Sequence, residues 1–202
     1  VWTGPAIGAG SIFSSVNVSD GVVYYGAEDN KMYALDANNG ANVWTYTTNG
    51  QVNSSPMVYG GMCIAGSDDN NIYCVEVLPG TGGTGQLRWQ LPTAERVRSS
   101  AAVHAATNTV LIGCHDFNLY AIDHVSGVLK WKYAAGSIIN SSPTVVGNKA
   151  YFASYDKYLY CIDARFGNLL WKTNMDYLCE SSPVVDDGSN EFYSGLSGLS
   201  TY

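Results

Sequence analysis

The chain has 202 residues, of which 13% are charged and 12% aromatic, and it contains 22 glycines. Ten lysines and arginines against 17 aspartates and glutamates give a net charge of −7, which argues against nucleic acid or an anionic membrane as a partner. No apolar run approaches the roughly 20 residues that a membrane-spanning helix needs, so membrane insertion is not expected.

A repeat of about 40 residues runs through the whole chain. Its first marker is tryptophan, with spacings of 42, 45, 42 and 40 residues between Trp2, Trp44, Trp89, Trp131 and Trp171. Its second marker is a serine pair at 14–15, 54–55, 99–100, 141–142 and 181–182, ten residues after each of the last four tryptophans. The longest interval contains "LPGTGGTG", residues 78–85, whose composition predicts an inserted loop.

Within each repeat the same parts follow one another in chain order. Apolar alternation follows the serines, and a second alternation ends in a turn that carries an acid: Asp29, Asp69, Asp116 or Asp156. Next come "YALD", "YCVE", "YAID" and "YCID", and then a glycine four residues before the tryptophan. This pattern predicts four strands of about five residues in each repeat, with approximate repeat ranges 3–44, 45–89, 90–131, 132–171 and a partial 172–202.

A four-stranded unit of this length is typical of a β-propeller blade, which needs a similar neighbour to cover its faces. The fold class predicted is therefore all-β: a β-propeller of four-stranded antiparallel blades in a single domain or segment, residues 1–202. The region around Trp2 resembles a last strand, and residues 172–202 resemble the earlier strands of a blade. Two arrangements stay open, a five-bladed ring closed by both ends or an arc of a seven- or eight-bladed ring, and the missing initiator Met slightly favours a segment of a larger protein.

The segments "ALDANNGANVW", "AIDHVSGVLKW" and "CIDARFGNLLW" closely resemble the tryptophan-docking motif of the pyrroloquinoline-quinone-like (PQQ-like) repeat family. The resemblance covers nearly the whole chain and implies that Trp44, Trp89, Trp131 and Trp171 stack between neighbouring blades. The second repeat departs from the motif, because Cys74 and Glu76 replace Ala and Asp and the insertion precedes Gly85.

The family that these motifs resemble contains two functional classes. One class consists of quinoprotein dehydrogenases, which use the quinone and usually calcium; the other consists of non-catalytic scaffolds, including a lipoprotein that assists outer-membrane barrel assembly. A dehydrogenase of the alcohol-oxidising type would be expected to carry vicinal cysteines, and this chain has none. Fold alone does not settle catalysis.

Several residue types that could carry chemistry are better explained by structure. The turn acids occupy the same position in every repeat, which separates them in space, whereas calcium needs six to eight converging oxygens; we expect them to hydrogen-bond within their turns. The histidines, His104, His115 and His124, lack zinc spacing. The five cysteines form no CxxC pair, and we expect buried thiols rather than a disulfide framework.

The position immediately before each serine pair varies in chemistry while its neighbours stay apolar or small. The residues at this position are Phe13, Asn53, Arg98, Asn140 and Glu180. If the first strand of each blade lines the propeller axis, these side chains gather at one mouth of the channel and form a partner- or ligand-binding site. The other interpretation is a set of solvated strand ends.

The sequence therefore predicts a non-catalytic propeller scaffold that binds a protein partner, with no catalytic residue, no metal site and no cofactor. The first alternative is a segment of a quinoprotein dehydrogenase, and the second is a carbohydrate-binding propeller. The resemblance slightly favours an extracytoplasmic location, periplasmic or secreted.

Overall fold

The computed structural model describes residues 10–77, 83–178, 180–186 and 191–193 of the chain. The chain divides into two compact units, residues 1–98 and 99–202. In the described parts of both units the regular structure is β, apart from one 3-10 turn, η1 (Ala105–Thr107).

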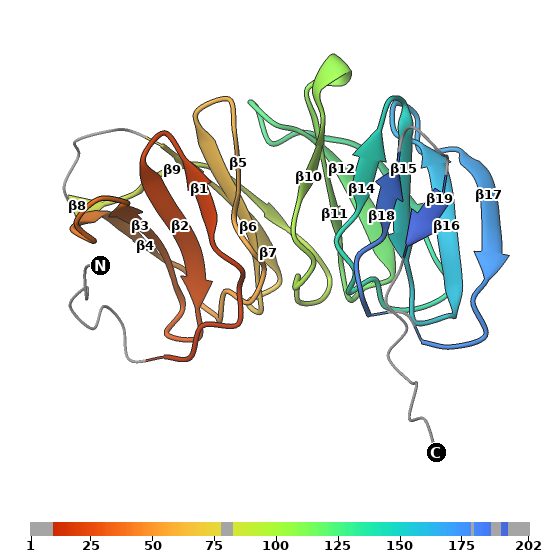
Figure 1. Ribbon diagram of the computed structural model, residues 1–202, viewed down its shortest axis with the longest axis horizontal. Helices are drawn as coiled ribbons and strands as arrows, with labels where there is room; N and C mark the ends of the chain where they lie inside the picture. Colours follow the sequence, from red (N-terminus) through yellow and green to blue (C-terminus); the bar gives the residue numbers. More distant parts are fainter. Residues whose placement is uncertain (1–9, 78–82, 179, 187–190, 194–202) are drawn as a thin grey trace. The chain divides into compact units, whose positions relative to one another are not determined.

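Unit 1 contains two antiparallel sheets (Figure 1, red to yellow). The first blade consists of β1 (Asn17–Ser19), β2 (Val22–Ala27), β3 (Lys31–Asp36) and β4 (Asn42–Thr47), in that order across the sheet. The second blade consists of β5 (Met57–Tyr59), β6 (Met62–Ser67), β7 (Asn71–Glu76) and β9 (Gln86–Pro92).

Unit 2 repeats this arrangement (Figure 1, green to blue). The third blade consists of β10 (Ala102–His104), β11 (Thr109–Gly113), β12 (Asn118–Asp123) and β13 (Leu129–Ala134). The fourth blade consists of β14 (Thr144–Val146), β15 (Lys149–Ala153), β16 (Tyr158–Asp163) and β17 (Leu169–Asn174). A hairpin of β18 (Val184–Asp186) and β19 (Glu191–Tyr193) follows.

The observed sheets confirm the predicted all-β fold of four-stranded antiparallel blades. Each outermost strand continues three residues beyond its tryptophan, so the predicted repeat boundaries fall inside these strands. Trp2 lies outside the described residues. The blade number of an intact ring stays a prediction.

The insertion in the second repeat is only partly the loop that its composition predicts. Its residues 83–84 form a short strand, β8 (Gly83–Thr84), which pairs in parallel with β4 at Trp44 and Thr45. Residues 78–82 lie outside the described part of the chain. The described end of the insertion therefore covers the outer edge of the first blade, an edge that would otherwise expose unpaired backbone groups.

Neighbouring blades within a unit share a hydrophobic core, which explains why the sequence repeats. In unit 1, Tyr24, Met32 and Trp44 of the first blade pack with Cys63 and Val75 of the second. In unit 2, Leu111 and Leu119 of the third blade pack in one cluster with Phe152 and Tyr160 of the fourth. A four-stranded sheet buries its apolar face only against another layer, and here that layer is the next blade.

A bulge interrupts the pairing of the two outer strands at the same place in each of the four described blades. The register shifts between Ala34 and Leu35, and at the equivalent positions of the other blades. In the first blade Ala34 pairs with Trp44 and Leu35 pairs with Asn42, which leaves Val43 as the extra residue. Such a bulge bends the strand and re-aims its side chains, and the recurrence shows that each repeat encodes the same local geometry.

Candidate binding site

In the first and fourth blades the first serine of the pair fixes the start of the blade and thereby the residue before it. Ser14 Oγ donates to the carbonyl of Gly26 at 2.8 Å and accepts from the amide of Gly26 at 2.9 Å. Ser141 makes the same two bonds with Ala153, at 2.9 and 2.8 Å. A buried hydroxyl that both donates and accepts in this way holds the incoming segment against the second strand of its own blade.

The second serine joins neighbouring blades. In unit 1 the amide of Ser15 donates to Ser55 Oγ at 2.8 Å. In unit 2 the amide of Ser100 donates to Ser142 Oγ, and the amide of Ser142 donates to Ser182 Oγ, both at 2.9 Å. The two serines therefore have different roles, and together they set the position of the variable residue that precedes them.

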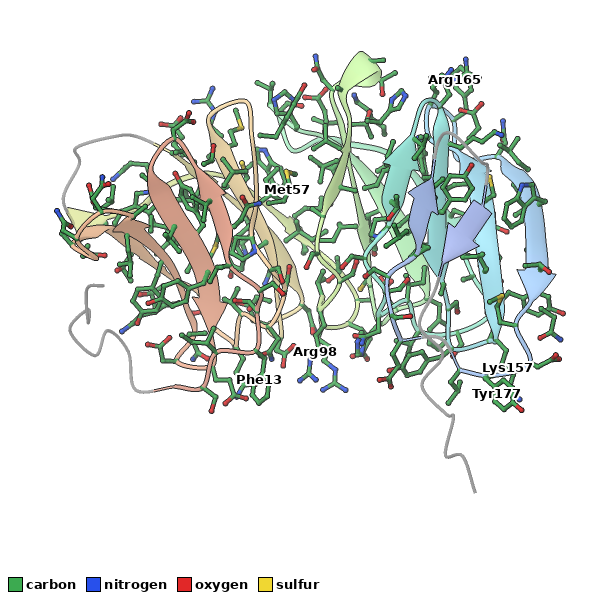
Figure 2. All side chains as sticks on the ribbon, in the orientation of Figure 1. Phe13, Met57, Arg98, Lys157, Arg165 and Tyr177 are labelled. Atoms are coloured by element: carbon green, nitrogen blue, oxygen red, sulfur yellow. The ribbon has the colours of Figure 1, made fainter. Side chains whose placement is uncertain are left out.

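In unit 1 the structure brings three of the predicted site residues to one pocket. Phe13, Asn53 and Arg98 line a cavity of about 300 Å³ together with Glu28. Phe13 is 71% exposed, and it lies with Arg98 at one edge of the blades (Figure 2). The pocket thus combines an exposed aromatic ring, an amide, a cation and an anion.

Asp68 holds two of these side chains in place. Arg98 donates to both carboxylate oxygens of Asp68, from Nε at 2.9 Å and from Nη2 at 2.7 Å. Asn53 Nδ2 also approaches Asp68 Oδ2, at 3.4 Å, and Asn53 Oδ1 is buried with no hydrogen-bond partner among the described residues. A bidentate pair fixes the guanidinium plane, and the Asn53 amide keeps unused capacity for a hydrogen-bond donor.

In unit 2 the other two predicted residues make equivalent cross-blade pairs. Asn140 Oδ1 lies 3.0 Å from His115 Nε2, which is the donor in this bond because an amide oxygen only accepts. Tyr155 donates its hydroxyl to Glu180 Oε1 at 2.7 Å. Each pair joins the residue before a serine pair to a residue of the preceding blade.

The partners of the predicted residues are a second variable set that the sequence analysis missed. They are Asp68, His115 and Tyr155, which bond to members of the first set, and Glu28, which lines the unit 1 pocket; each lies immediately before a turn acid. The signal that could have identified them is the one used for the first set: a position that changes charge and size from repeat to repeat while its neighbours are kept. The candidate site therefore combines two variable positions of neighbouring repeats.

The turn acids have the structural role that the sequence predicts, and the partner is a tyrosine four residues later. Tyr73 donates to Asp69 at 2.7 Å, and the corresponding distance is 2.5 Å for Tyr33 and Asp29, for Tyr120 and Asp116, and for Tyr160 and Asp156. Burial and the bond to the carboxylate raise the pKa of all four phenols, which stay protonated donors. Asp69 and Asp156 also accept the amides of Asn49 and Gly136, which lie in the connection that enters the same blade.

The four tryptophans of the described blades differ in their surroundings. Trp44 is 1% and Trp89 7% exposed, Trp131 is half-buried, and Trp171 is 36% exposed. Trp44 packs against Gly85 of the second blade, and Trp131 packs against Gly167 of the fourth. Trp131 Nε1 also donates to the carbonyl of Arg165 at 3.1 Å. Trp171 contacts Tyr151 of its own blade, and interblade stacking remains a prediction at Trp89 and Trp171.

Other groups that could carry chemistry are accounted for within the described residues. Cys63, Cys74, Cys114 and Cys161 are buried thiols, as the sequence predicts, and Cys179 lies outside the described part. Among the described residues there is no group of three or more His, Cys, Asp or Glu side chains that could hold a metal ion. Over the same residues the structure contains no helix with the length and apolarity needed to span a bilayer.

The repeated blades and their tryptophan motif define a β-propeller of the PQQ-like repeat class. The family described as "Outer membrane protein assembly factor BamB" matches residues 1–194, and the chain belongs to this family.

Two BamB proteins illustrate the relationship. BamB from Moranella endobia (strain PCIT) is 27% identical over 146 residues, covering 65% of this chain and 36% of the relative. The crystal structure of BamB from Moraxella catarrhalis superposes with a TM-score of 0.77 and 25% identity, covering 92% of this chain and 56% of that one. The computationally designed Ika8 protein superposes with a TM-score of 0.74 at 18% identity, covering 90% of this chain and 54% of that one, and shares the fold alone. The chain thus spans between about a third and about half of the length of these proteins.

Proposed function

We propose that this chain is a non-catalytic interaction scaffold that binds a protein partner at the end of its blades where the variable residues lie. The observation that carries this proposal is the pocket of Phe13, Glu28, Asn53 and Arg98. Aromatic residues and arginine are the side chains that most often dominate the binding energy of protein interfaces, especially with a polar rim around them. Because Asp68 already fixes Arg98, a partner would find this surface preorganised.

The names of the relatives support the same class of role. The relative from Moranella endobia is described as the outer membrane protein assembly factor BamB, and the Moraxella catarrhalis structure carries the same name, BamB. We therefore propose that the partner belongs to a protein-assembly machinery and that the protein works outside the cytoplasm. The shared repeats and the variable pocket support this role. The crosslinking experiment described below would identify the partner.

The described residues do not fit the quinone-and-calcium site of the dehydrogenase alternative. Each turn carboxylate is bonded to a tyrosine of its own blade, so these acids do not converge on one point as calcium ligands must. The cysteines are not vicinal in the sequence. No step of the proposed function passes through a quinone.

Site-specific photo-crosslinking in the source organism tests the scaffold proposal. A benzophenone amino acid replaces Phe13 in one variant and Phe166 in a control variant, because both rings are highly exposed, at 71% and 64%. We expect one discrete protein adduct from position 13 that is lost when Glu28→Lys reverses the charge at position 28. Adducts of equal pattern from both positions, or none from position 13, would refute this binding site. Quinone- and calcium-dependent dye reduction by the purified protein would refute the non-catalytic assignment.

A further inference from the structure

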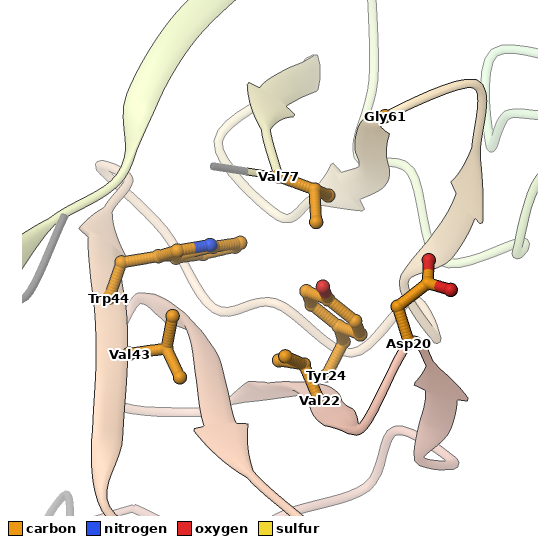
Figure 3. A pocket seen from close by; sticks show the side chains of 7 residues that line it. All are labelled: Asp20, Val22, Tyr24, Val43, Trp44, Gly61 and Val77. Carbon is orange, nitrogen blue, oxygen red and sulfur yellow. The ribbon is translucent and has the colours of Figure 1, made fainter. Parts of the chain in front are cut away.

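A second cavity of unit 1 lies at the opposite end of the same two blades. Its volume is about 240 Å³, and Val22, Val43 and Val77 form much of its wall. Asp20, in the β1–β2 turn, and Gly61, in the β5–β6 turn, place it at the other end of β2 from Glu28. The remaining lining residues are Tyr24 and Trp44, whose rings face into the cavity (Figure 3).

Two buried polar groups of this cavity have no hydrogen-bond partner among the described residues. They are the hydroxyl of Tyr24, which is 0% exposed, and the indole Nε1 of Trp44, which is 1% exposed. Figure 3 shows the Tyr24 oxygen pointing into the space between Trp44 and Val77. Leaving such a group buried and unpaired destabilises the folded protein, so each one calls for an explanation.

The third blade shows that an unpaired indole is not a general property of the repeat. Trp131 occupies the position of Trp44, and its Nε1 donates to the carbonyl of Arg165 in the turn of the next blade. In both cases the indole ring lies against the glycine that recurs four residues before the next tryptophan, Gly85 or Gly167. The first blade therefore keeps the packing of the repeat, while its buried indole N–H has no acceptor among the described residues.

The chemistry of the free groups limits what could bind. Trp44 Nε1 only donates. Burial, with Cys63 and Asp20 adding to it, raises the pKa of Tyr24 to about 12, so its phenol is protonated at neutral pH and can donate as well. The walls are apolar, and Asp20 is exposed at the rim. The cavity is larger than the ~150 Å³ apolar cavity known to bind benzene and smaller than most drug-sized pockets of about 300–1,000 Å³.

We propose that this cavity is a binding site for a small, mainly apolar molecule that presents a carbonyl oxygen to Trp44 Nε1–H and Tyr24 O–H. The valines and the two rings would enclose its hydrocarbon part, and one oxygen with two lone pairs can accept both donors once the side chains that bury them move aside. This site is separate from the pocket of Phe13 and Arg98, so its failure would leave the scaffold proposal intact.

Acetophenone and α-methylstyrene form a matched pair of probes, because they have nearly the same shape and only the ketone accepts a hydrogen bond. Each is titrated into the ¹⁵N-labelled protein while the indole N–H resonances are followed; Trp44→Phe assigns the Trp44 signal, and the Trp131 signal is an internal reference. We expect a saturable downfield shift of the Trp44 signal with acetophenone. We expect α-methylstyrene to bind at least about 10-fold more weakly, because it leaves both buried donors unpaired.

Tyr24→Phe tests the second donor at nearly constant volume. We expect it to weaken acetophenone binding about 5-fold, the effect of one ordinary hydrogen bond, and to leave α-methylstyrene unchanged. Tyr151→Phe is the matched control, because Tyr151 pairs with Trp171 at the same 6.0 Å ring distance that joins Tyr24 to Trp44. Equal affinity for both probes, no effect of Tyr24→Phe, or a Trp44 signal that never saturates, as in a cavity that holds only water, would overturn the proposal.

Discussion

The turn acids show how a single residue supports each blade. Asp116 accepts the Tyr120 hydroxyl and the amide of Asn118, and it lies close to the Cys114 thiol. Burial by itself would raise the pKa of Asp116, but the bonds from Tyr120, Asn118 and Cys114 outweigh burial and hold this pKa below its ordinary value. A carboxyl group whose pKa is lowered by folding stabilises the protein above the pKa it has in the unfolded chain.

This linkage gives a prediction for Asp116→Asn. At pH 7 we expect the variant to lose about 1.5–3 kcal/mol of unfolding free energy, the usual range for hydrogen bonds to charged groups. The difference from wild type should shrink as the pH falls below about 4, where the unfolded-state carboxyl takes up its proton and then the native one does too. Urea unfolding at several pH values measures this. Asp176→Asn, an exposed site with the same change in net charge, is the control, and a pH-independent gap would contradict the linkage.

The residue after the turn acid reveals a local mismatch between sequence and backbone. Asn30 and Asn70 adopt the left-handed region with φ of 68° and 65°, whereas Phe117 and Lys157 occupy it in unit 2 with φ of 74° and 72°. The left-handed region costs most side chains about 1–2 kcal/mol and costs asparagine less.

We therefore expect Phe117→Asn to stabilise the protein by about 0.5–1 kcal/mol, since it copies the residue that unit 1 uses in the same turn. Phe117 is 45% exposed, so little packing is lost. Thermal unfolding measures the effect, and Phe166→Asn, which replaces a similarly exposed ring, controls for the loss of surface hydrophobicity. A lower melting temperature for Phe117→Asn than for the control would contradict this account.

At the scale of elements, one position in each repeat must hold a small residue, because its strand closely approaches the segment that enters the next blade. A Cβ on Gly66 would lie 2.3 Å from Val97 Cγ1, and one on Gly113 would lie 2.4 Å from Ile139 Cγ2. The segments are also hydrogen-bonded there, from the amides of Val97 and Ile139 to the preceding blade. In the fourth repeat the sequence has Ala153 at the glycine position and Cys179 at the branched position.

The fourth repeat therefore suggests a pair of substitutions in the third repeat that should compensate for each other. Gly113→Ala should destabilise the protein by about 1–3 kcal/mol through overpacking. Ile139→Cys should also destabilise it, by leaving a cavity, but the double variant copies the pair in the fourth repeat and should recover part of the loss. A double-mutant cycle in urea measures the coupling. Additive losses would show that the contact between residues 113 and 139 does not explain the glycine.

Sequence periodicity predicted the strands, the turn acids and the first variable set because each recurs at the same position of every repeat. The second variable set was not predicted, because a position next to a recurring turn acid is easily assigned to the turn itself. Its role became visible only in the structure, through the pairs Asp68–Arg98, His115–Asn140 and Tyr155–Glu180. The cavity beside Trp44 was also out of reach. Its distinguishing feature is an indole that has no acceptor in the described part of the chain, whereas the tryptophan motif itself is shared with Trp131.

At the scale of the whole molecule, each unit is a short series of blades in which neighbouring blades share a core. Stability in such a repeat protein is approximately the sum of terms for each repeat and for each interface. Within unit 2, Ser142 contributes to two interfaces, since its Oγ accepts the Ser100 amide of the third blade and its amide donates to Ser182. Loss of the Ser142 hydroxyl should therefore lower the local stability of both blades that meet at the interface.

We expect Ser142→Ala to cost about 1–2 kcal/mol, because the Ser100 amide loses its acceptor. Hydrogen exchange should accelerate in both β10 and β14, the first strands of the third and fourth blades, because the interface term belongs to both. Ser126→Ala is the control: Ser126 bonds only to Asp123 and Val128 of its own turn in the described contacts, so its effect should stay local. Faster exchange confined to β14 would mean that the serine supports its own blade and does not join the two.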